Sequence, residues 1–459
     1  MPRSPSVAIV GGGASGALAA IHLLRHARAR ATPMEVILID RDGRHALGQA
    51  YSTTDPHHLL NTTADKMSAL DGDHGHLVRW ARDHGLEVDG SDYLPRPLYG
   101  RYLREVLAAA ERPPAQVLRR VTGTVTALDH RHGVSVRLGD GRRVDADAIV
   151  LALGNRPPAA LPRVVAGAGS RYVADPWRTD ALTRICDGAP VLVLGTGLTM
   201  VDVAVTVSRT HPDAVVYALS RHALLPRPHP HPLPLPVPTP IPPGPLKVAD
   251  LLRAVRLAVR SRGGDWHGVV DGLRPQAQAL WARLTPDERR RFLRLVARYW
   301  EVHRHRIPPA TAARVADLRA SGRLRVLRGS LVQAATVAPD RLRLGVEVEG
   351  VARELDVGWL VNATGPGSRT VDDPLLSGLV AAGTARPDAV RLGLDVDPRG
   401  ALLDADGHPN ARIFALGPLL RGSLYETTAV PEIRAQAAAL APRLVEAATS
   451  PVLVSRPSP

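Results

Sequence analysis

A glycine-rich turn between an apolar strand and a helix lies close to the start of the chain. Residues 7–10 form the apolar run VAIV, the next six read GGGASG, and residues 17–28 have the composition of a helix. In this G-x-G-x-x-G pattern Gly11 permits a tight turn, Gly13 lets a pyrophosphate approach the backbone, and Gly16 lets the helix pack closely on the strand. The N–H groups at the start of the helix attract phosphate. The pattern predicts a parallel α/β unit that binds a dinucleotide.

A second apolar strand supports this interpretation and narrows the choice of nucleotide. Residues 35–39 follow the helix and end in Asp40, whose carboxylate can accept hydrogen bonds from both hydroxyl groups of an adenosine ribose. An acid at this position disfavours a 2′-phosphate, so the site is expected to take FAD or NAD rather than NADP. Ala14 and Ser15 are expected to supply phosphate-binding N–H groups. The alternative is a glycine-rich turn in an unrelated βαβ unit.

The same arrangement recurs near the middle of the chain. The apolar run at 190–194 leads into Gly195 and Gly197, but Met200 replaces the third glycine. This larger side chain is expected to move the helix slightly off the strand without removing the phosphate-facing N–H groups, which include those of Leu198 and Thr199. The next strand ends in Ser220 and Arg221 where an acid would otherwise stand. A hydroxyl and an arginine suit a 2′-phosphate, so NADPH is favoured over NADH; the alternative for Arg221 is an ordinary surface arginine.

Two stretches of short strands echo each other and predict how the units are connected. Residues 117–154 and 324–365 each contain a run of short strands that ends in a glycine, Gly154 in the first and Gly365 in the second. We expect one copy to leave the first nucleotide unit and the other to return to it. The fold class is therefore α/β, with two Rossmann-type domains, the FAD domain being discontinuous around a nested NADPH domain.

The expected domain boundaries follow from this arrangement. The first segment of the FAD domain is assigned to 1–160, the NAD(P)H domain to 161–330, the second FAD segment to 331–449 and a flexible tail to 450–459. Within the nested domain lie a proline-rich loop at 226–245 and a helical insert at 247–320. The loop is either a stiff linker or a rigid flap over the nicotinamide or substrate.

Composition excludes several other classes of protein. The net charge is +14, but arginines are spread along the whole chain and aromatic residues make up only 3%, so no nucleic-acid partner is expected. The sequence lacks a secretory signal and any run of about 18 apolar residues, so we expect a cytoplasmic protein without a membrane partner. Cys186 is the sole cysteine, which excludes an intrachain disulfide and a CxxC redox pair, and no metal site is predicted. The oligomeric state stays open.

These motifs resemble those of flavoproteins with two dinucleotide-binding domains. Residues 47–103 are similar to flavin-dependent N-hydroxylating monooxygenases, and motifs along nearly the whole chain resemble bacterial FAD/NAD(P)-binding proteins labelled YdhS-like. The resemblance implies FAD and NADPH as cofactors. The resemblance also implies six further cofactor-binding residues, which are Asn61, Met67, Gly154, Gly365, Gly417 and Pro418. Where relatives have Gly-Asp in the last FAD motif, this chain has Gly417-Pro418, so that contact must come from elsewhere.

The resemblance also implies the chemistry. It favours a monooxygenase that uses dioxygen and hydroxylates a small molecule through a C4a-peroxyflavin, with nitrogen as one candidate position of hydroxylation. The alternatives are a simple NADPH-flavin reductase that passes electrons to a quinone or a protein partner, and a non-catalytic redox sensor that holds FAD. Arg96, His303 and His305 are the candidate catalytic residues. An equal alternative for the two histidines is that they have no catalytic role and stand at the C-terminus of a helix, where a basic side chain suits the helix dipole.

Overall fold

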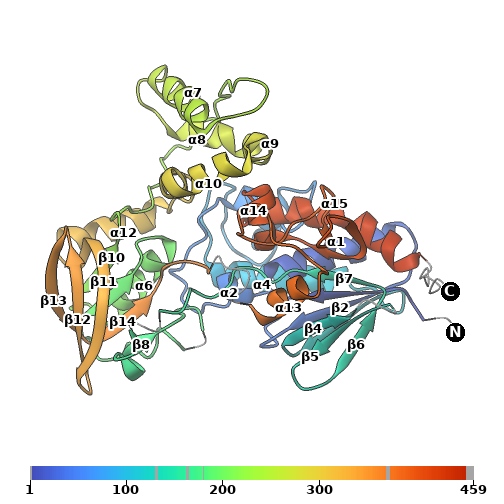
Figure 1. The fold of residues 1–459 in the computed structure, drawn as a ribbon, viewed down its shortest axis with the longest axis horizontal. Helices are drawn as coiled ribbons and strands as arrows, with labels where there is room; N and C mark the ends of the chain where they lie inside the picture. Colours follow the sequence, from blue (N-terminus) through green and yellow to red (C-terminus); the bar gives the residue numbers. More distant parts are fainter. Residues whose placement is uncertain (1–2, 130–132, 162–164, 179, 368–372, 451–459) are drawn as a thin grey trace.

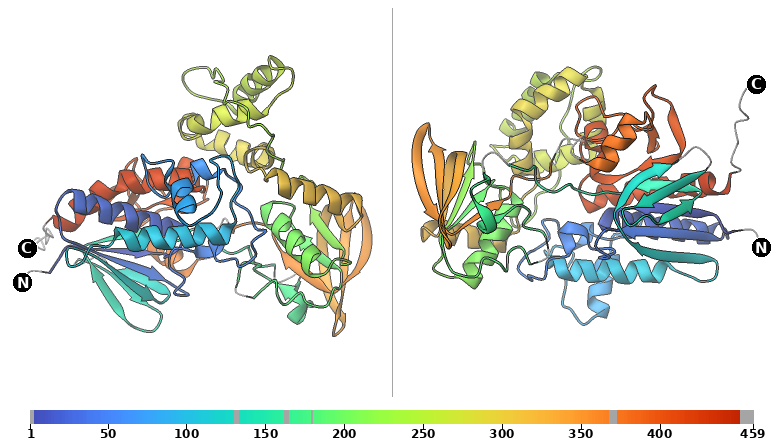
Figure 2. Two further views of the ribbon diagram at one scale, coloured as in Figure 1. Left: turned by 180° about the vertical axis from the view of Figure 1, so that it is seen from behind. Right: turned by 60° about the horizontal axis from the view of Figure 1, so that its bottom comes forward.

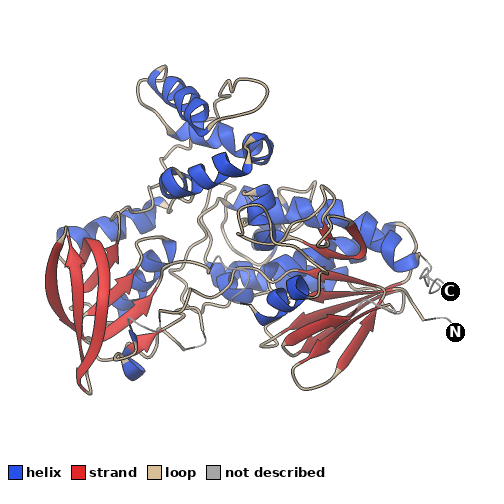
Figure 3. Cartoon of the chain, in the orientation of Figure 1, coloured by secondary structure: helices blue, strands red, loops and turns tan. Residues whose placement is uncertain are grey.

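Two α/β modules lie side by side, and a helical segment stands above the junction between them (Figure 1). The computed structural model describes residues 3–129, 133–161, 165–178, 180–367 and 373–450. Strands are concentrated in the two modules, whereas the segment above them is built of helices and loops (Figure 3). The view from behind places the same segment over both modules (Figure 2).

The first module is built on a six-stranded sheet in the order β15-β16-β7-β1-β2-β3. All neighbouring strands are parallel except β15 and β16. The strands are β1 (Ser6–Val10), β2 (Met34–Asp40), β3 (Gln116–Thr122), β7 (Ala148–Leu151), β15 (Ala401–Leu403) and β16 (Pro409–Ala415). The chain order reverses between β1 and β7, and in such sheets the ligand crevice lies at the carboxyl ends of the strands at this point.

The second module repeats this order in a seven-stranded sheet, β13-β12-β11-β10-β9-β14-β8. Its strands are β8 (Tyr172–Val173), β9 (Val191–Leu194), β10 (Val216–Ser220), β11 (Leu324–Ala338), β12 (Arg341–Val348), β13 (Val351–Val357) and β14 (Trp359–Asn362). The parallel order β11-β10-β9-β14 matches β3-β2-β1-β7 of the first module. The reversal point of the second sheet therefore lies between β9 and β14.

The strand pairing shows where the chain passes between modules. The expected boundary at residue 330 falls inside β11, whose first five residues pair with β10 and whose remaining part, from Gly329 to Ala338, pairs with β12. Strands β11 to β14 therefore extend the second sheet, and β15 and β16 are the strands that return to the first. The first copy of the repeat has the matching antiparallel sheet of β4 (Val125–Asp129), β5 (Val134–Leu138) and β6 (Arg143–Ala146).

Helices cover both sheets and bury the apolar faces of the strands. In the first module α1 (Ala14–Ala29) packs between its sheet, α4 (Arg96–Ala110) and the long C-terminal helix α15 (Val430–Thr449), which explains why most of α1 is buried. The shorter helices are α2 (Gly48–Tyr51), η1 (Ala64–Lys66), α3 (His76–Asp83), α13 (Pro374–Ala381), η5 (Gly417–Leu420) and α14 (Arg421–Leu424). In the second module α6 (Leu198–Thr210) packs against α12 (Pro309–Ala320).

The helical insert has a small core of its own. It comprises α7 (Val248–Arg260), α8 (His267–Leu273), η3 (Arg274–Gln276), α9 (Ala277–Arg283), α10 (Pro286–Leu295) and α11 (Ala297–Arg304). Trp281 and Phe292 of the insert pack on Tyr425, which belongs to the segment that follows α14. The insert is therefore anchored to the C-terminal part of the first module. Helix α12, within the expected insert, instead forms the crossover from β10 to β11.

The proline-rich loop lies along α8, and glycines in that helix make room for it. The backbone N–H of Val237 donates to the carbonyl of Gly268 at 2.8 Å. A Cβ atom on Gly272 would lie 1.9 Å from the carbonyl oxygen of Val237. Pro226, at the start of the loop, lines the central cavity described below. The loop therefore packs against the insert at Val237 and reaches the central cavity at Pro226.

None of the helices in the described part of the chain has the length and apolarity that a membrane crossing needs.

The contact between the proline-rich loop and α8 predicts a difference between two helical glycines. Gly272→Ala should lower the free energy of unfolding by about 1–3 kcal/mol, because its Cβ would overlap the Val237 carbonyl. Gly378→Ala in α13 meets no atom within 4 Å and should raise it by about 0.5–1 kcal/mol. Urea denaturation of both variants tests this, and equal effects would show that the loop does not constrain α8.

Candidate functional site

A cavity of about 1780 Å³ opens between the two modules and reaches both glycine turns. It is lined by residues at the carboxyl ends of β1 and β9, by the loop that precedes α3, and by α11 of the insert. It therefore lies where the order of each parallel sheet reverses, which is the usual ligand position in this sheet type.

The first glycine turn is packed directly on the neighbouring strand. Gly11 has φ +107°, and a Cβ atom on it would lie 2.3 Å from the carbonyl oxygen of Ala152, just after β7. A Cβ on Gly16 would lie 1.9 Å from the Gly11 carbonyl oxygen. Helix α1 begins after Gly13 without a side-chain cap, and Ala14 and Ser15 of its first turn line the cavity. The first N–H groups of a helix have no partner within the helix, so they are available to a ligand there.

The second turn reproduces the same close contact. Gly195 has φ +106°, and its Cβ would lie 2.2 Å from the carbonyl oxygen of Ala363, just after β14. Helix α6 begins after Gly197, as α1 begins after Gly13, again without a side-chain cap. Leu198 and Thr199 line the cavity, while Met200 is fully buried in the core of the module. The side chain that replaces the third glycine is therefore accommodated in the core, and the helix start is retained.

The residues that end β2 and β10 differ as the sequence indicates. Asp40 lines the cavity, and its Oδ1 accepts the N–H groups of Asp42 at 3.0 Å and Arg44 at 2.9 Å. Ser220 bonds the Thr196 hydroxyl at 2.9 Å and does not line the cavity. Its role is to shape the turn next to the glycines.

Arg221 is exposed at the carboxyl end of β10, outside the cavity lining. The neighbouring His222 has its pKa lowered by desolvation and by the positive charges of Arg298, Arg221 and Arg328. Arg328 lies on β11 directly beside Ser220. Several basic groups thus gather at this end of the second sheet, and sequence reasoning identified only Arg221 among them.

The loop that carries Asn61 and Met67 is fixed by buried polar contacts. Both residues line the cavity. Arg434 of α15 donates to the carbonyl of Ser68 at 2.8 Å, and the Tyr102 hydroxyl accepts the N–H of Ala69 at 2.9 Å. Because Arg434 and Tyr102 are buried, this part of the cavity wall is held rigidly in place.

The C-terminal turn that lacks the expected aspartate is closed by an amide and a hydroxyl. Gly417 has φ +76°, and its N–H donates to Gln436 Oε1 at 2.9 Å. The Thr427 hydroxyl donates to the Gly417 carbonyl at 3.0 Å, and Pro418 lines the cavity. Gly154 and Gly365 also line it, with positive φ values of 65° and 86°.

Arg96 joins the two modules across the cavity. Its guanidinium lies 3.0 Å from the carboxylate of Asp202 on α6, and its Nε donates to the Leu59 carbonyl at 3.1 Å. Both side chains of the ion pair are largely buried. Arg96 also lies 5.6 Å from the ring centre of Trp177. The arrangement makes Arg96 a residue that positions the second module against the first.

The two candidate histidines at the end of α11 face different ways. His305 lines the cavity, and its Nε2 lies 3.1 Å from Glu301 Oε2 one helical turn earlier. His303 does not line it, because its ring packs edge-on against Trp266 at 4.6 Å and bonds the Tyr299 carbonyl. The structure therefore brings His305, but not His303, to the shared site.

Glu301 is the centre of a polar cluster that sequence reasoning missed. Its Oε1 lies 2.7 Å from Arg421 and 3.4 Å from the Tyr425 hydroxyl. Against the effect of burial, His305 and Arg421 lower the pKa of Glu301 to about 2, so it is ionised at neutral pH. Burial raises the pKa of Tyr425 well above its usual value. The i,i+4 spacing of Glu301 and His305 was the available signal, whereas nothing in the sequence places Arg421 beside them.

A buried ionic seam lies behind this cluster, where the insert meets the first module. Arg304 lies 3.2 Å from Glu426 and 3.6 Å from Glu432, and Arg274 lies 2.8 Å from Glu432. The Trp300 indole N–H donates to Glu426 at 2.9 Å. These pairs connect α11 to the start of α15, and so they fix the cavity wall that carries His305.

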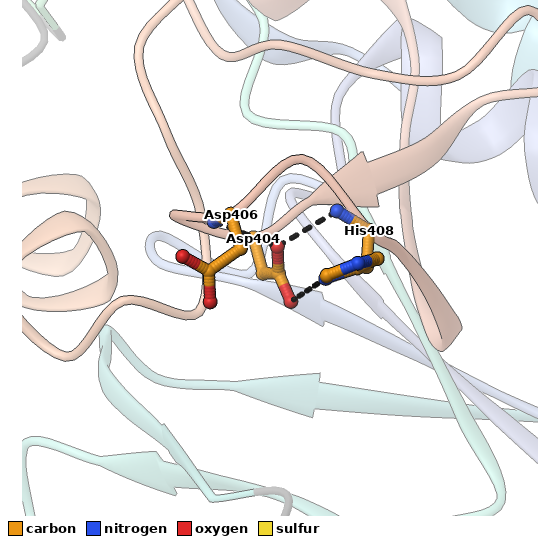
Figure 4. Close-up of side chains that lie close together, drawn as sticks. All are labelled: Asp404, Asp406 and His408. Carbon is orange, nitrogen blue, oxygen red and sulfur yellow. Dashed lines mark hydrogen bonds and ion pairs between the residues drawn. The ribbon is translucent and has the colours of Figure 1, made fainter.

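Three residues with metal-ligand side chains lie together on the turn before β16: Asp404, Asp406 and His408 (Figure 4). Asp404 Oδ1 already accepts the N–H groups of Asp406 at 3.0 Å and His408 at 2.8 Å. The other two side chains are exposed. The turn itself accounts for this cluster, which takes no part in the central cavity.

Comparison with known proteins agrees with this architecture. Residues 8–156 match the family model described as FAD-NAD(P)-binding. No curated protein matches the sequence. The reduced form of the ornithine hydroxylase PvdA from Pseudomonas aeruginosa has a TM-score of 0.67 and 16% sequence identity, with coverage of 97% of this chain and 100% of that chain.

Two further solved structures are similar over the same length. The L-lysine 6-monooxygenase from Pseudomonas syringae gives a TM-score of 0.65 at 17% identity, covering 97% of this chain and 100% of that one. The ornithine N-hydroxylase KtzI from Kutzneria sp. 744 gives 0.63 at 18% identity, covering 96% and 99%. At these identities the likeness concerns the fold. The predicted fold class, with two Rossmann-type units, is confirmed: this chain has the two-dinucleotide fold of these monooxygenases.

Proposed function

We propose that the protein is an FAD- and NADPH-dependent monooxygenase that hydroxylates a small amine at nitrogen. The observation that carries this proposal is that both glycine turns and the Glu301–His305 pair line the same cavity. The similar structures named above as ornithine and lysine hydroxylases support it, since they share the fold over nearly the whole chain. With one cysteine, the chain has no CxxC pair for a dithiol mechanism.

The first turn fits FAD and the second fits NADPH. The close contacts of Gly11 and Gly16 leave no space for side chains and expose the uncapped start of α1 to a pyrophosphate. Asp40 retains Oδ2 for ribose hydroxyls, since Oδ1 is used by the turn. At the second turn, Arg221 and Arg328 provide positive charge for a 2′-phosphate.

FAD, when bound, supplies the redox and oxygen chemistry of the overall reaction. In that reaction NADPH, a proton, dioxygen and an amine give NADP⁺, water and an N-hydroxylamine. The residues of the chain orient the reactants: Arg96 and Asp202 hold the modules together, and the seam of Arg304 and Glu426 fixes the insert over the cavity.

His305 is proposed to take a proton from the substrate. A protonated amine has no lone pair with which to attack oxygen, so it must lose a proton first. Because Nε2 of His305 bonds Glu301, its other ring nitrogen, Nδ1, is the one proposed to accept this proton. Glu301, ionised at neutral pH, then stabilises the imidazolium ion that forms.

Cofactor content and product test the function directly. The purified protein should carry, or bind on addition, one FAD, and NADPH oxidation in air should rise with a suitable amine and yield an equal amount of hydroxylamine by mass spectrometry. Ornithine, lysine and cadaverine are the first substrates to test. Oxidation of NADPH with peroxide as the sole product, across an amine panel, would favour a reductase. A protein that binds no FAD would refute the proposal.

Arg221 should select the phosphorylated cofactor. Arg221→Ala should weaken NADPH binding by about tenfold or more, because a charge-assisted contact to phosphate is lost, and should change NADH binding by less than about twofold. Arg256→Ala on α7, an exposed arginine remote from β10, is the matched control. Titrations followed by fluorescence measure the affinities of the unmodified protein and of both variants for NADPH and for NADH. Equal loss for both cofactors in Arg221→Ala would contradict the role of Arg221.

His305 and His303 form a matched pair on one helix. His305→Gln should lower kcat at pH 7 by about 100-fold, the usual effect of losing a general base, while the rate of flavin reduction by NADPH is retained. The deficit should shrink as pH rises, because more of the amine is then free of its proton. His303→Gln should change kcat by less than about twofold, since it faces Trp266. A pH-independent deficit in His305→Gln would show that His305 acts structurally.

A further inference from the structure

A second cavity of about 650 Å³ lies away from both glycine turns. Its walls come from the later half of α6, the start of α12 and the loop at 57–59 of the first module. Figure 1 shows α6 and α12 next to each other at the side of the second module that faces the insert. The cavity is therefore bounded by both modules, as the central one is, and shares α6 with it.

Four of the ten residues that line this cavity are arginine or histidine. Arg209, Arg314, Arg323 and His57 line it, and none of its lining residues is acidic. Arg209 is neutralised by Asp55 at 3.0 Å. Arg323 donates to the carbonyl of Pro212 at 2.5 Å and to the Ser321 hydroxyl at 3.3 Å, neither of which carries a charge.

Arg314 has the least satisfied of these guanidinium groups. Its Nε atom is buried and has no hydrogen-bond partner among the residues that the structure describes. A buried donor without a partner costs free energy, and an anion in the cavity would remove that cost. Two arginines, Arg314 and Arg323, thus line one cavity, and neither pairs with a carboxylate in the part of the chain that the structure describes.

The start of α12 adds to the positive potential. The helix follows Pro308 and begins at Pro309, which has no N–H, so the N–H groups of Ala310 and Thr311 are the first of the helix. Both residues line the cavity. Unpaired N–H groups and the helix dipole favour an anion here, and the Thr311 hydroxyl is a further donor.

We propose that this cavity binds a small polyanion, a molecule with two or more carboxylate or phosphate groups. Paired guanidinium groups recognise these planar or tetrahedral oxyanions by charge-assisted hydrogen bonds. The volume exceeds the roughly 30 Å³ that a single water occupies in the liquid by more than tenfold. A molecule with several anionic groups therefore suits the space better than one inorganic ion.

Occupancy of the cavity would couple to the central site through the loop at 55–59. Asp55 and His58 bond Thr206 of α6 at 2.8 and 2.9 Å, and the Leu59 carbonyl accepts from Arg96, which pairs with Asp202 in the central cavity. A ligand held between α12 and this loop would fix the second module against the first. The site is thus placed to regulate the contact between the modules.

Calorimetry with citrate and with pyrophosphate at constant ionic strength tests the proposal. At least one probe should bind saturably, and it should still bind when saturating FAD and NADP⁺ fill the central cavity. Citrate alone would identify a polycarboxylate site, and pyrophosphate alone a phosphate site. Arg314→Ala and Arg323→Ala should each weaken binding at least tenfold. Arg319→Ala, an exposed arginine on the same helix, is the matched control and should change it by less than twofold.

Hydrogen exchange of the unmodified protein gives a second readout that needs no variant. The bound probe should slow amide exchange in residues 55–59 and at the start of α12. The proposal is overturned if neither probe saturates, if FAD and NADP⁺ abolish the binding, or if Arg319→Ala weakens it as much as the cavity variants do. None of these measurements requires turnover, so the result is independent of the proposed monooxygenase activity.

Discussion

This architecture depends on a close contact between a glycine and a carbonyl group, and each of the two modules contains one such contact. Gly11 lies against the carbonyl of Ala152, and Gly195 against that of Ala363, at the reversal point of each sheet. A Cβ atom at either position would come within 2.3 Å of the oxygen, so no other residue allows the turn to close there. Each contact fixes where a helix begins relative to its sheet, and hence where the N–H groups of that helix point.

The insert supplies part of the wall of the central cavity through Glu301 and Val302 of α11. Ion pairs and an apolar contact together hold the insert on the first module. Arg304, Glu426 and Glu432 are buried together, and stacking of Trp281 on Tyr425 supports them. Buried ion pairs are costly to desolvate but specific in geometry, which suits a wall whose exact position determines what His305 can reach.

Much of the fold followed from local pattern. The glycine turns, the strands before and after them and the change from Asp40 to Ser220-Arg221 are short signals, and the structure contains each of them in the expected element. The repeat that ends in Gly154 and Gly365 indicated a nested module. The predicted domain boundary at 330 lies inside a strand, because β11 continues without a break from its parallel pairing with β10 into its antiparallel pairing with β12. The sequence of β11 does not mark this change.

The site depended more on tertiary structure. The sequence by itself determined two parallel modules, the positions where their first helices begin after the glycine turns, and the absence of a dithiol, because each of these is set within a few residues or by composition. Only the folded chain brought Arg421 to Glu301 across 120 positions, joined Arg96 to Asp202 and turned His305 toward the cavity and His303 away from it. No periodicity or fixed spacing in the sequence indicates such pairs, because the packing of separate elements creates them.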